Sequence, residues 1–331
     1  MSGDKKPSPP PVWRALPKVL LHEHLDGGLR PSTLLELCAA RGVAVPETDA
    51  GKLALWMHAN ADSGSLERYL QGFAITVAAM ASEAACERVA FEAAEDARTD
   101  GCVLAEFRMA PLLLEPFGLS GEAVVEATLA AGASIINDVS GLLYPEVVDS
   151  CVRHNAGLVV MHTRARPKTR LQDQGLYDDV TSDVVEFLQD RVDLAVSRGL
   201  LRSAVIVDPG PDFTKTPYQT VEMLRGLDRV RALGRPVLLA LSRKDFLGAI
   251  TGQAPRGREA ATHAAIAYFA STPGTIVRVH DVRAAIDVIA TVEVLAGLKH
   301  LDPGYLLPEE IRHEPRHTRR RAGGSVDDRR H

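Results

Sequence analysis

The second half of the chain contains five short apolar runs that end in polar side chains suited to chemistry. They read ASIINDVSG, VVMHTR, VIVDPGPDFTKT, LALSRKDFLG and TIVRVHDV. The side chains at or just after their ends include Asn137, His162, Asp208, Lys244, Arg278 and His280. Asp and Asn can pair with the hydrogen-bonding edge of a flat heterocycle, and Lys and Arg can hold a phosphate or pyrophosphate. The set therefore suits displacement of an anionic leaving group from a heterocyclic substrate.

Each of these residues taken singly has an ordinary structural explanation. A strand-end Asp such as Asp208 can cap the next helix, and Arg243 can form a surface ion pair. Five polar strand ends that converge on one mouth are much harder to explain by packing, because the carboxyl ends of barrel strands are where barrel enzymes place their chemistry.

The first half contains a different candidate site, the segment LLHEHLDGG. His22 and His24 alternate along an expected strand, so their rings are expected to point the same way. That spacing suits two ligands of a zinc ion. A bare H-x-H pair also occurs often by chance, so the pair alone does not establish a metal site.

Seven apolar runs separated by longer amphipathic stretches must position these residues. Such alternation is typical of a parallel α/β fold. The expected strands are residues 18–22, 103–108, 133–137, 157–162, 203–208, 236–241 and 275–280. Residues 181–198 and 258–270 have helical periodicity, and residues 45–97 read as wholly helical. We expect an α/β, TIM-barrel-like (β/α)8 architecture that is incomplete, with seven recognisable strands and no eighth.

Composition narrows the class of protein. Of 331 residues, 46% are apolar and 24% charged, as in an ordinary globular protein with a sizeable core. The net charge of −5 gives no sign of a nucleic-acid or membrane partner, and no apolar run reaches the length of a membrane span. The cysteines lack C-x-x-C spacing and the N-terminus lacks an apolar signal region, so we expect reduced thiols and a cytoplasmic location.

The five C-terminal motifs, in order and spacing, resemble those of dihydropteroate synthases over about residues 130–298. The resemblance implies that Asn137 and Asp208 grip the edge of the pterin ring. It also implies that Met161 and Phe213 form apolar walls, and that Lys244 lies near both the pterin and the aminobenzoate.

The same resemblance implies that Arg278 and His280 bind the pyrophosphate, and that the catalytic residues are Lys244, Arg278 and Asp208. The family joins p-aminobenzoate to a dihydropterin methyl diphosphate, releases pyrophosphate and uses Mg²⁺ to stabilise the departing charge. These small molecules are therefore the expected partners, and Mg²⁺ is an expected cofactor.

The chain departs from the synthase pattern in two ways. Asp212, Thr214 and Ala240 stand where the family usually has glycine, which affects loop geometry. The N-terminal motifs are missing, among them TPDSF, the GGESTRPG loop and SVDT. With them are lost the family's metal-contacting Asn, a pterin-contacting Asp and the mobile loops that cover the substrates.

Residues 17–125 instead resemble adenosine deaminases, through HEHLDG, ADSGSLERYLQGF and VLAEFRMAP. This resemblance implies Zn²⁺ bound by His22 and His24, with Asp26 and Gly27 contacting substrate. The HAGE-type and TDDP-type segments of the deaminase site are absent. His162, Asp208, His280 and Asp281 could make a substitute metal site, although His162, Asp208 and His280 also fit the synthase pattern.

We therefore divide the chain into a disordered tail (1–16), a deaminase-like barrel fragment (17–127), a synthase-like pterin-binding fragment (128–302) and a basic disordered tail (303–331). The junction is expected at 122–132, within a helix. Two deaminase-like strands replace three synthase strands, so we expect an open barrel with lowered stability or homodimerisation through its free edge. Three functions stay open: a dihydropteroate synthase-like transferase, a zinc-dependent adenosine deaminase, and an inactive pterin-binding fusion protein.

Overall fold

The structure is a computed structural model that describes residues 18–61, 66–166, 169, 171–269, 272–308 and 311–312. Side chains at 18, 19, 21, 22, 61 and 66–70 are outside this description. Of the two expected disordered tails, residues 1–16, 309–310 and 313–331 lie outside it. By internal contacts the chain divides into two compact units, residues 1–289 and 290–331, and every site described below lies in the first.

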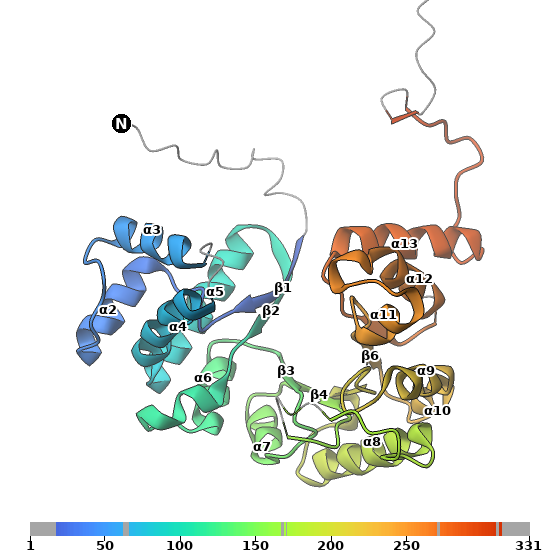
Figure 1. Cartoon of the computed structure of the whole chain (residues 1–331), viewed down its shortest axis with the longest axis horizontal. Coiled ribbons are helices and arrows are strands. Elements are labelled where there is room, and N and C mark those ends of the chain that lie inside the picture. Colours follow the sequence, from blue (N-terminus) through green and yellow to red (C-terminus); the bar gives the residue numbers. More distant parts are fainter. Residues whose placement is uncertain are drawn as a thin grey trace, which may run out of the picture. The chain divides into compact units, whose positions relative to one another are not determined.

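All seven predicted strands are present among the described residues. Helices separate most of them along the chain (Figure 1). Their bounds are β1 Lys18–His24, β2 Cys102–Arg108, β3 Ile135–Asp138, β4 Gly157–Met161, β5 Val205–Asp208, β6 Val237–Leu239 and β7 Thr275–Val277. They form two parallel sheets, β1-β2 and β3-β4-β5-β6-β7. The fold is therefore α/β as expected, and no pairing among the described residues joins the two sheets.

Helices occupy the two segments predicted from periodicity, 181–198 and 258–270, and most of residues 45–97. In the N-terminal part they are α2 Pro31–Arg41, α3 Ala50–Ala61, α4 Leu66–Met80, α5 Glu83–Thr99 and α6 Gly121–Ala130. After β3 they are α7 Glu146–Arg153, α8 Val180–Ser197, α9 Pro217–Arg225, α10 Leu227–Arg231, α11 Asp245–Thr251, α12 Glu259–Phe269 and α13 Val282–Leu295. None of the helices within the described ranges is both long and apolar enough to cross a membrane.

Local sequence explains where several of these helices begin. Asp179 caps α8 by accepting hydrogen bonds from the N–H groups of Thr181 and Ser182. Thr216 and Gln219 form a reciprocal capping box at the start of α9, with Pro217 in its first turn. Because α8 and α9 follow the loops after β4 and β5, these caps fix where those loops end.

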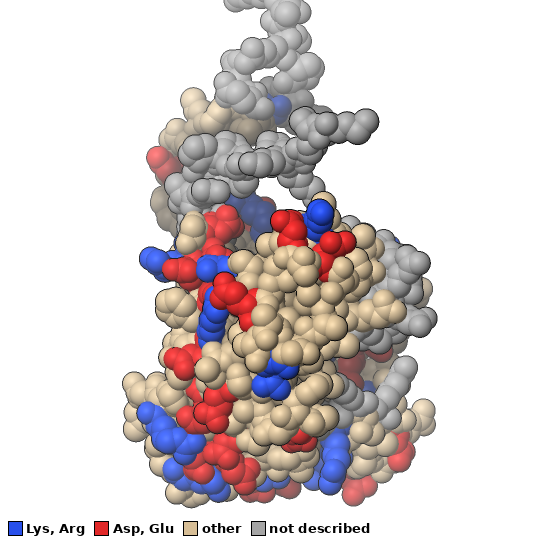
Figure 2. Space-filling view, turned by 90° about the vertical axis from the view of Figure 1, so that its left-hand side faces the viewer, with Lys and Arg blue, Asp and Glu red and all other residues tan. Residues whose placement is uncertain are grey.

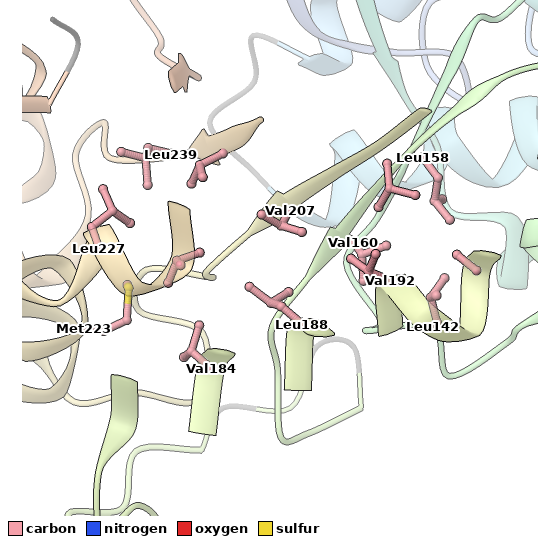
Figure 3. Packing of buried hydrophobic residues seen from close by; sticks show 14 of the residues in the cluster. Leu142, Leu158, Val160, Val184, Leu188, Val192, Val207, Met223, Leu227 and Leu239 are labelled. Carbon is pink, nitrogen blue, oxygen red and sulfur yellow. The ribbon is translucent and has the colours of Figure 1, made fainter. Parts of the chain in front are cut away.

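The main core lies between the five-stranded sheet and its helices (Figure 3). Leu158 and Val160 of β4 and Val207 of β5 face Leu188 and Val192 of α8, and all five are buried. Alternation along a strand turns the neighbouring side chains to the opposite face of the sheet. That opposite face is partly open.

The predicted junction falls in α6, which contacts two cores. Val124 and Ala127 belong to an N-terminal cluster that also contains Met80 and Val89. Leu129, two residues after Ala127 in α6, belongs to the main core. The helix therefore packs on both parts of the chain.

The surface carries charges of both signs. On the face shown in Figure 2, Lys and Arg side chains are interspersed with Asp and Glu. This arrangement agrees with the small net charge of −5.

Candidate active site

Strand register brings three of the predicted substrate-binding residues to one face of the sheet. Asn137 pairs with Val159, and Met161 pairs with Asp208. Since Val159 and Met161 are two residues apart on one strand, their side chains share a face. Asn137, Met161 and Asp208 therefore lie together on the face that points away from α8.

Asp208 is the buried anion of the site. Its carboxylate accepts a hydrogen bond of 2.8 Å from the N–H of Gly210, and the residue is only 5% exposed. A Cβ at position 210 would lie 2.3 Å from the carbonyl oxygen of His162, so this turn requires glycine. Burial raises the pKa of Asp208 to about 6, against the opposing charges of Lys244, Lys215 and Arg278.

The loop after Asp208 contains two of the positions at which the synthase motif has glycine. Asp212 and Thr214 have φ of 64° and 53°, the left-handed region that favours glycine. Hydrogen bonds hold both: Asp212 accepts one from Thr220, and Thr214 accepts one from the N–H of Arg164. The departures in sequence are therefore compatible with a glycine-type loop, at the cost of backbone strain.

Lys244 lies immediately before α11, where its Nζ is 4.5 Å from the centre of the Phe213 ring. This is the geometry of a cation–π contact. Burial lowers the pKa of Lys244. A hollow of about 230 Å³ opens here, lined by Asp212, Phe213, Arg243, Lys244 and Asp245. Arg243 also forms the ion pair expected of it, with Glu259.

Arg278 follows β7 and is bound by a residue that the sequence analysis did not single out. Its Nε donates to Oε2 of Glu106 at 2.8 Å, and its Nη2 donates to Oε1. The Glu106 carboxylate raises the pKa of Arg278, against the effect of burial. Glu106 lies in β2, within AEFR of the deaminase-like segment, and no motif in that segment marked it as a partner of the synthase-like part.

His280 lies near the same positive charges. Its Nδ1 is 2.8 Å from the hydroxyl of Ser242. Burial lowers its pKa, and the neighbouring Arg243 and Arg278 lower it further. His280 is therefore a neutral hydrogen-bonding group at pH 7.

Four polar residues linked by hydrogen bonds support the loop, and sequence reasoning missed the lysine at the buried end of this chain, Lys215. The Lys215 ammonium donates to His162 Nδ1 at 2.8 Å and to the carbonyls of Gly210 and Phe213, each at 3.1 Å. His162 Nε2 lies 2.9 Å from Asp183, which also pairs with Arg164. Burial lowers the pKa of Lys215 to about 7 and that of His162 to about 4. The signal was present in the sequence as the lysine of DFTKT.

These contacts leave the synthase-type residues as one cluster. The charges of Lys244 and Arg278 act on Asp208 and on each other, and those of Arg278 and Lys244 act on His280. Phe213 joins the cluster through Lys244. The cluster places the buried carboxylate of Asp208 among the cations of Lys244 and Arg278.

The deaminase-type residues are arranged differently. His24 Nδ1 lies 3.1 Å from Asp26, whose other carboxylate oxygen accepts from the N–H of Ala110. The side chain of His22 is outside the described residues. Among the side chains that are described, no three His, Cys, Asp or Glu come together as a metal site.

Comparison with known proteins assigns the two parts. An adenosine deaminase family model matches residues 17–183, and a pterin binding enzyme model matches residues 120–280. The deaminase match spans just over half of the chain, which therefore belongs to the adenosine deaminase family in that part, and the second match shows that the C-terminal part is similar to pterin binding enzymes. The two matches overlap over residues 120–183, so they do not locate the junction more closely than the α6 region.

The chain matches only part of the length of its relatives in each family. Adenosine deaminase 1 of Streptomyces coelicolor is 55% identical over 124 residues, which are 37% of this chain and 31% of that protein. Dihydropteroate synthase of Streptococcus pyogenes serotype M1 is 39% identical over 172 residues, 51% of this chain and 62% of that protein. The chain thus spans less than two thirds of either relative.

Crystal structures of dihydropteroate synthases share the fold. The Thermus thermophilus enzyme in complex with 4-aminobenzoate is 30% identical, with a TM-score of 0.54, covering 62% of this chain and 89% of that one. The Yersinia pestis enzyme with a sulfonamide drug is 19% identical, with a TM-score of 0.57. This match covers 86% of this chain and 95% of that one. The likeness supports a TIM-barrel type of architecture.

Proposed function

We propose that the chain is a dihydropteroate synthase-like, pterin-binding transferase of folate biosynthesis, with its site in the C-terminal part. The observation that carries this proposal is the cluster at the ends of β5, β6 and β7. There the ionisable Asp208 lies among the positive charges of Lys244 and Arg278. A carboxylate beside cations suits a substrate that combines a donor-rich ring with an anionic leaving group.

The ring would be held by the residues on the inner face of the sheet. Asp208 in its ionised form can accept two hydrogen bonds from the amino and ring N–H groups of a pterin, and the Asn137 amide can add a donor and an acceptor. Met161 is fully buried beside Asp208 and gives the ring an apolar wall. Phe213 gives a second wall that Lys244 covers.

The cations would act on the leaving group. In the proposed reaction the amine nitrogen of p-aminobenzoate bonds to the pterin methylene carbon, the carbon–oxygen bond to the diphosphate breaks, and the amine loses a proton. Lys244, Arg278 and the neutral His280 can donate hydrogen bonds to the departing pyrophosphate. Lys244 is poised for this because it lies beside both Phe213 and Asp208.

The metals of the two families do not fit the described residues. The metal-contacting Asn expected of a synthase is absent from the sequence, and the described side chains offer no three-ligand group for zinc. We therefore assign Mg²⁺ and Zn²⁺ no step. A deaminase activity at His22 and His24 is not favoured, since a catalytic zinc needs three protein ligands.

Two further expectations remain part of the proposal. The four cysteines are free thiols, which supports a reducing, cytoplasmic compartment. Homodimerisation through the outer edge of β3 or β7 would pair backbone groups at an edge that has no strand partner among the described residues. Sedimentation of the purified chain would show whether it forms that dimer.

Turnover tests the transferase. We expect pyrophosphate release from a dihydropterin methyl diphosphate that depends on p-aminobenzoate, and that falls at least about 100-fold in Lys244→Ala, because the cation beside the leaving group is lost. Lys52→Ala, an exposed lysine of α3, is the matched control. Wild-type protein that binds the pterin but releases no pyrophosphate would overturn the transferase and leave a pterin-binding protein.

A further inference from the structure

Arg278 is the cation that the synthase resemblance assigns to the diphosphate, yet in this chain it already holds an anion. Glu106 receives two different guanidinium nitrogens, Nε and Nη2, on its two oxygens. This two-pronged arrangement is the strong form of an Arg–carboxylate pair. A diphosphate oxygen would need the same donors.

The pair is sheltered enough to matter energetically. The side chains of Arg278 and Glu106 are 31% and 27% exposed, so water screens their attraction less than on an open surface. The residues are 172 positions apart in the chain and come from the parts related to different families. Glu106 belongs to the deaminase-type strand, whereas Arg278 belongs to the pterin-binding part.

We propose that Glu106 acts as an internal competitor for the diphosphate at Arg278, and so cancels the affinity that the diphosphate would otherwise add to pterin binding at this site. The inference rests on the proposed function, since it concerns the same site. Any diphosphate must displace the Glu106 carboxylate from Arg278, and it then meets that negative charge nearby. A pterin alcohol or a pteroate makes no such demand, because Asp208, Asn137 and Met161 hold the ring alone.

Comparison of two ligands in one protein tests the idea. We would titrate the full chain calorimetrically with 6-hydroxymethyl-7,8-dihydropterin and with its diphosphate, and take the ratio of the two dissociation constants. We expect a ratio near one in the wild type. In Glu106→Gln, the diphosphate should bind roughly tenfold or more tightly than before, the gain of a charge-assisted pair, while the alcohol is unchanged.

Three variants control the result. Glu87→Gln removes the same charge from an exposed position of α5 and should leave the ratio at one. The double variant Glu106→Gln/Arg278→Ala should lose the gain. Glu106→Asp keeps the charge, and so protects the fold if the amide variant is unstable, but draws the carboxylate back and should give an intermediate gain.

The outcomes separate this inference from the proposed function. If both ligands bind and the ratio is the same in Glu106→Gln as in the wild type, or the gain survives Arg278→Ala, Glu106 is no competitor. If neither ligand binds any of the proteins, the proposed pterin site is wrong, and the proposed role of Glu106 is then wrong as well.

Discussion

The two sheets of the molecule differ in how completely other residues cover them, and this difference bears on which family's motifs form a site. The five-stranded sheet has a buried core on one face and the charged cluster at its strand ends. The two-stranded sheet is poorly covered: Val103 and Leu104, neighbours on β2 that point to opposite faces, are 72% and 57% exposed. Parallel strands are normally buried on both faces. The synthase-type motifs therefore stand on a packed scaffold, and the deaminase-type motifs do not.

Helices provide most of the core in the N-terminal part. Leu34, Cys38 and Leu53 pack together away from the strands. In the C-terminal part the strands themselves supply buried residues such as Val205 and Leu239. The N-terminal part therefore keeps its helical packing although its sheet has two strands among the described residues.

Because the two parts have separate cores, a cavity made in one core should destabilise mainly that part. This is the largest effect that we expect. Leu188→Ala should cost about 3 kcal/mol in the free energy of unfolding, because Leu188 is fully buried. Both tryptophans, Trp13 and Trp56, lie in the N-terminal part. The variant should therefore lower the melting midpoint seen by far-UV circular dichroism more than the midpoint seen by tryptophan fluorescence.

Leu34→Ala is the matched change in the other core. Leu34 is buried to the same degree, so a similar cost is expected, now mainly in the tryptophan signal. Equal shifts of both signals in both variants would show that the two parts unfold as one, and the distinction drawn between them would be lost.

A smaller effect should appear in the pH dependence of pterin binding. Burial raises the pKa of Asp208 to about 6, and only the ionised carboxylate can accept hydrogen bonds from both pterin N–H groups. Affinity should therefore be nearly constant above pH 7 and fall about tenfold per unit below pH 6. Calorimetric titration between pH 5 and 8 measures it, with buffers of matched ionic strength.

The same shift gives the sign of a stability effect. Because the folded pKa of Asp208 is above the usual value, its contribution to stability is greatest in acid and is lost as pH rises through about 6.

For the binding experiment, a pterin affinity that rises on acidification would contradict the role of the ionised Asp208 carboxylate.

Much of this architecture could be predicted from sequence. The seven strands were found from their apolar runs, because such runs are long enough to be read locally. The cluster of Asp208, Lys244 and Arg278 followed from the rule that parallel strands bring their carboxyl ends together. An incomplete barrel with no eighth strand was predicted, but the division of the strands into two separate sheets was not.

What could not be predicted depends on contacts between distant segments. Nothing near Glu106 in the sequence indicates that it meets Arg278. Lys215 was not singled out within DFTKT, yet its ammonium is fully buried against His162. The left-handed backbone of Thr214 was not predicted either, because a residue other than glycine is uncommon in that region.

The most direct test of the central claim is calorimetric titration with a dihydropterin diphosphate analogue, with zinc content assayed on the same samples. Wild type, Asp208→Asn and His24→Ala would be compared, and Asp190→Asn, an exposed position of α8, controls for loss of charge. We predict micromolar binding that falls at least about 100-fold in Asp208→Asn and is unchanged in the other two variants. No pterin binding in the wild type, with one zinc per chain that is lost in His24→Ala, would contradict it and move the function to the N-terminal part.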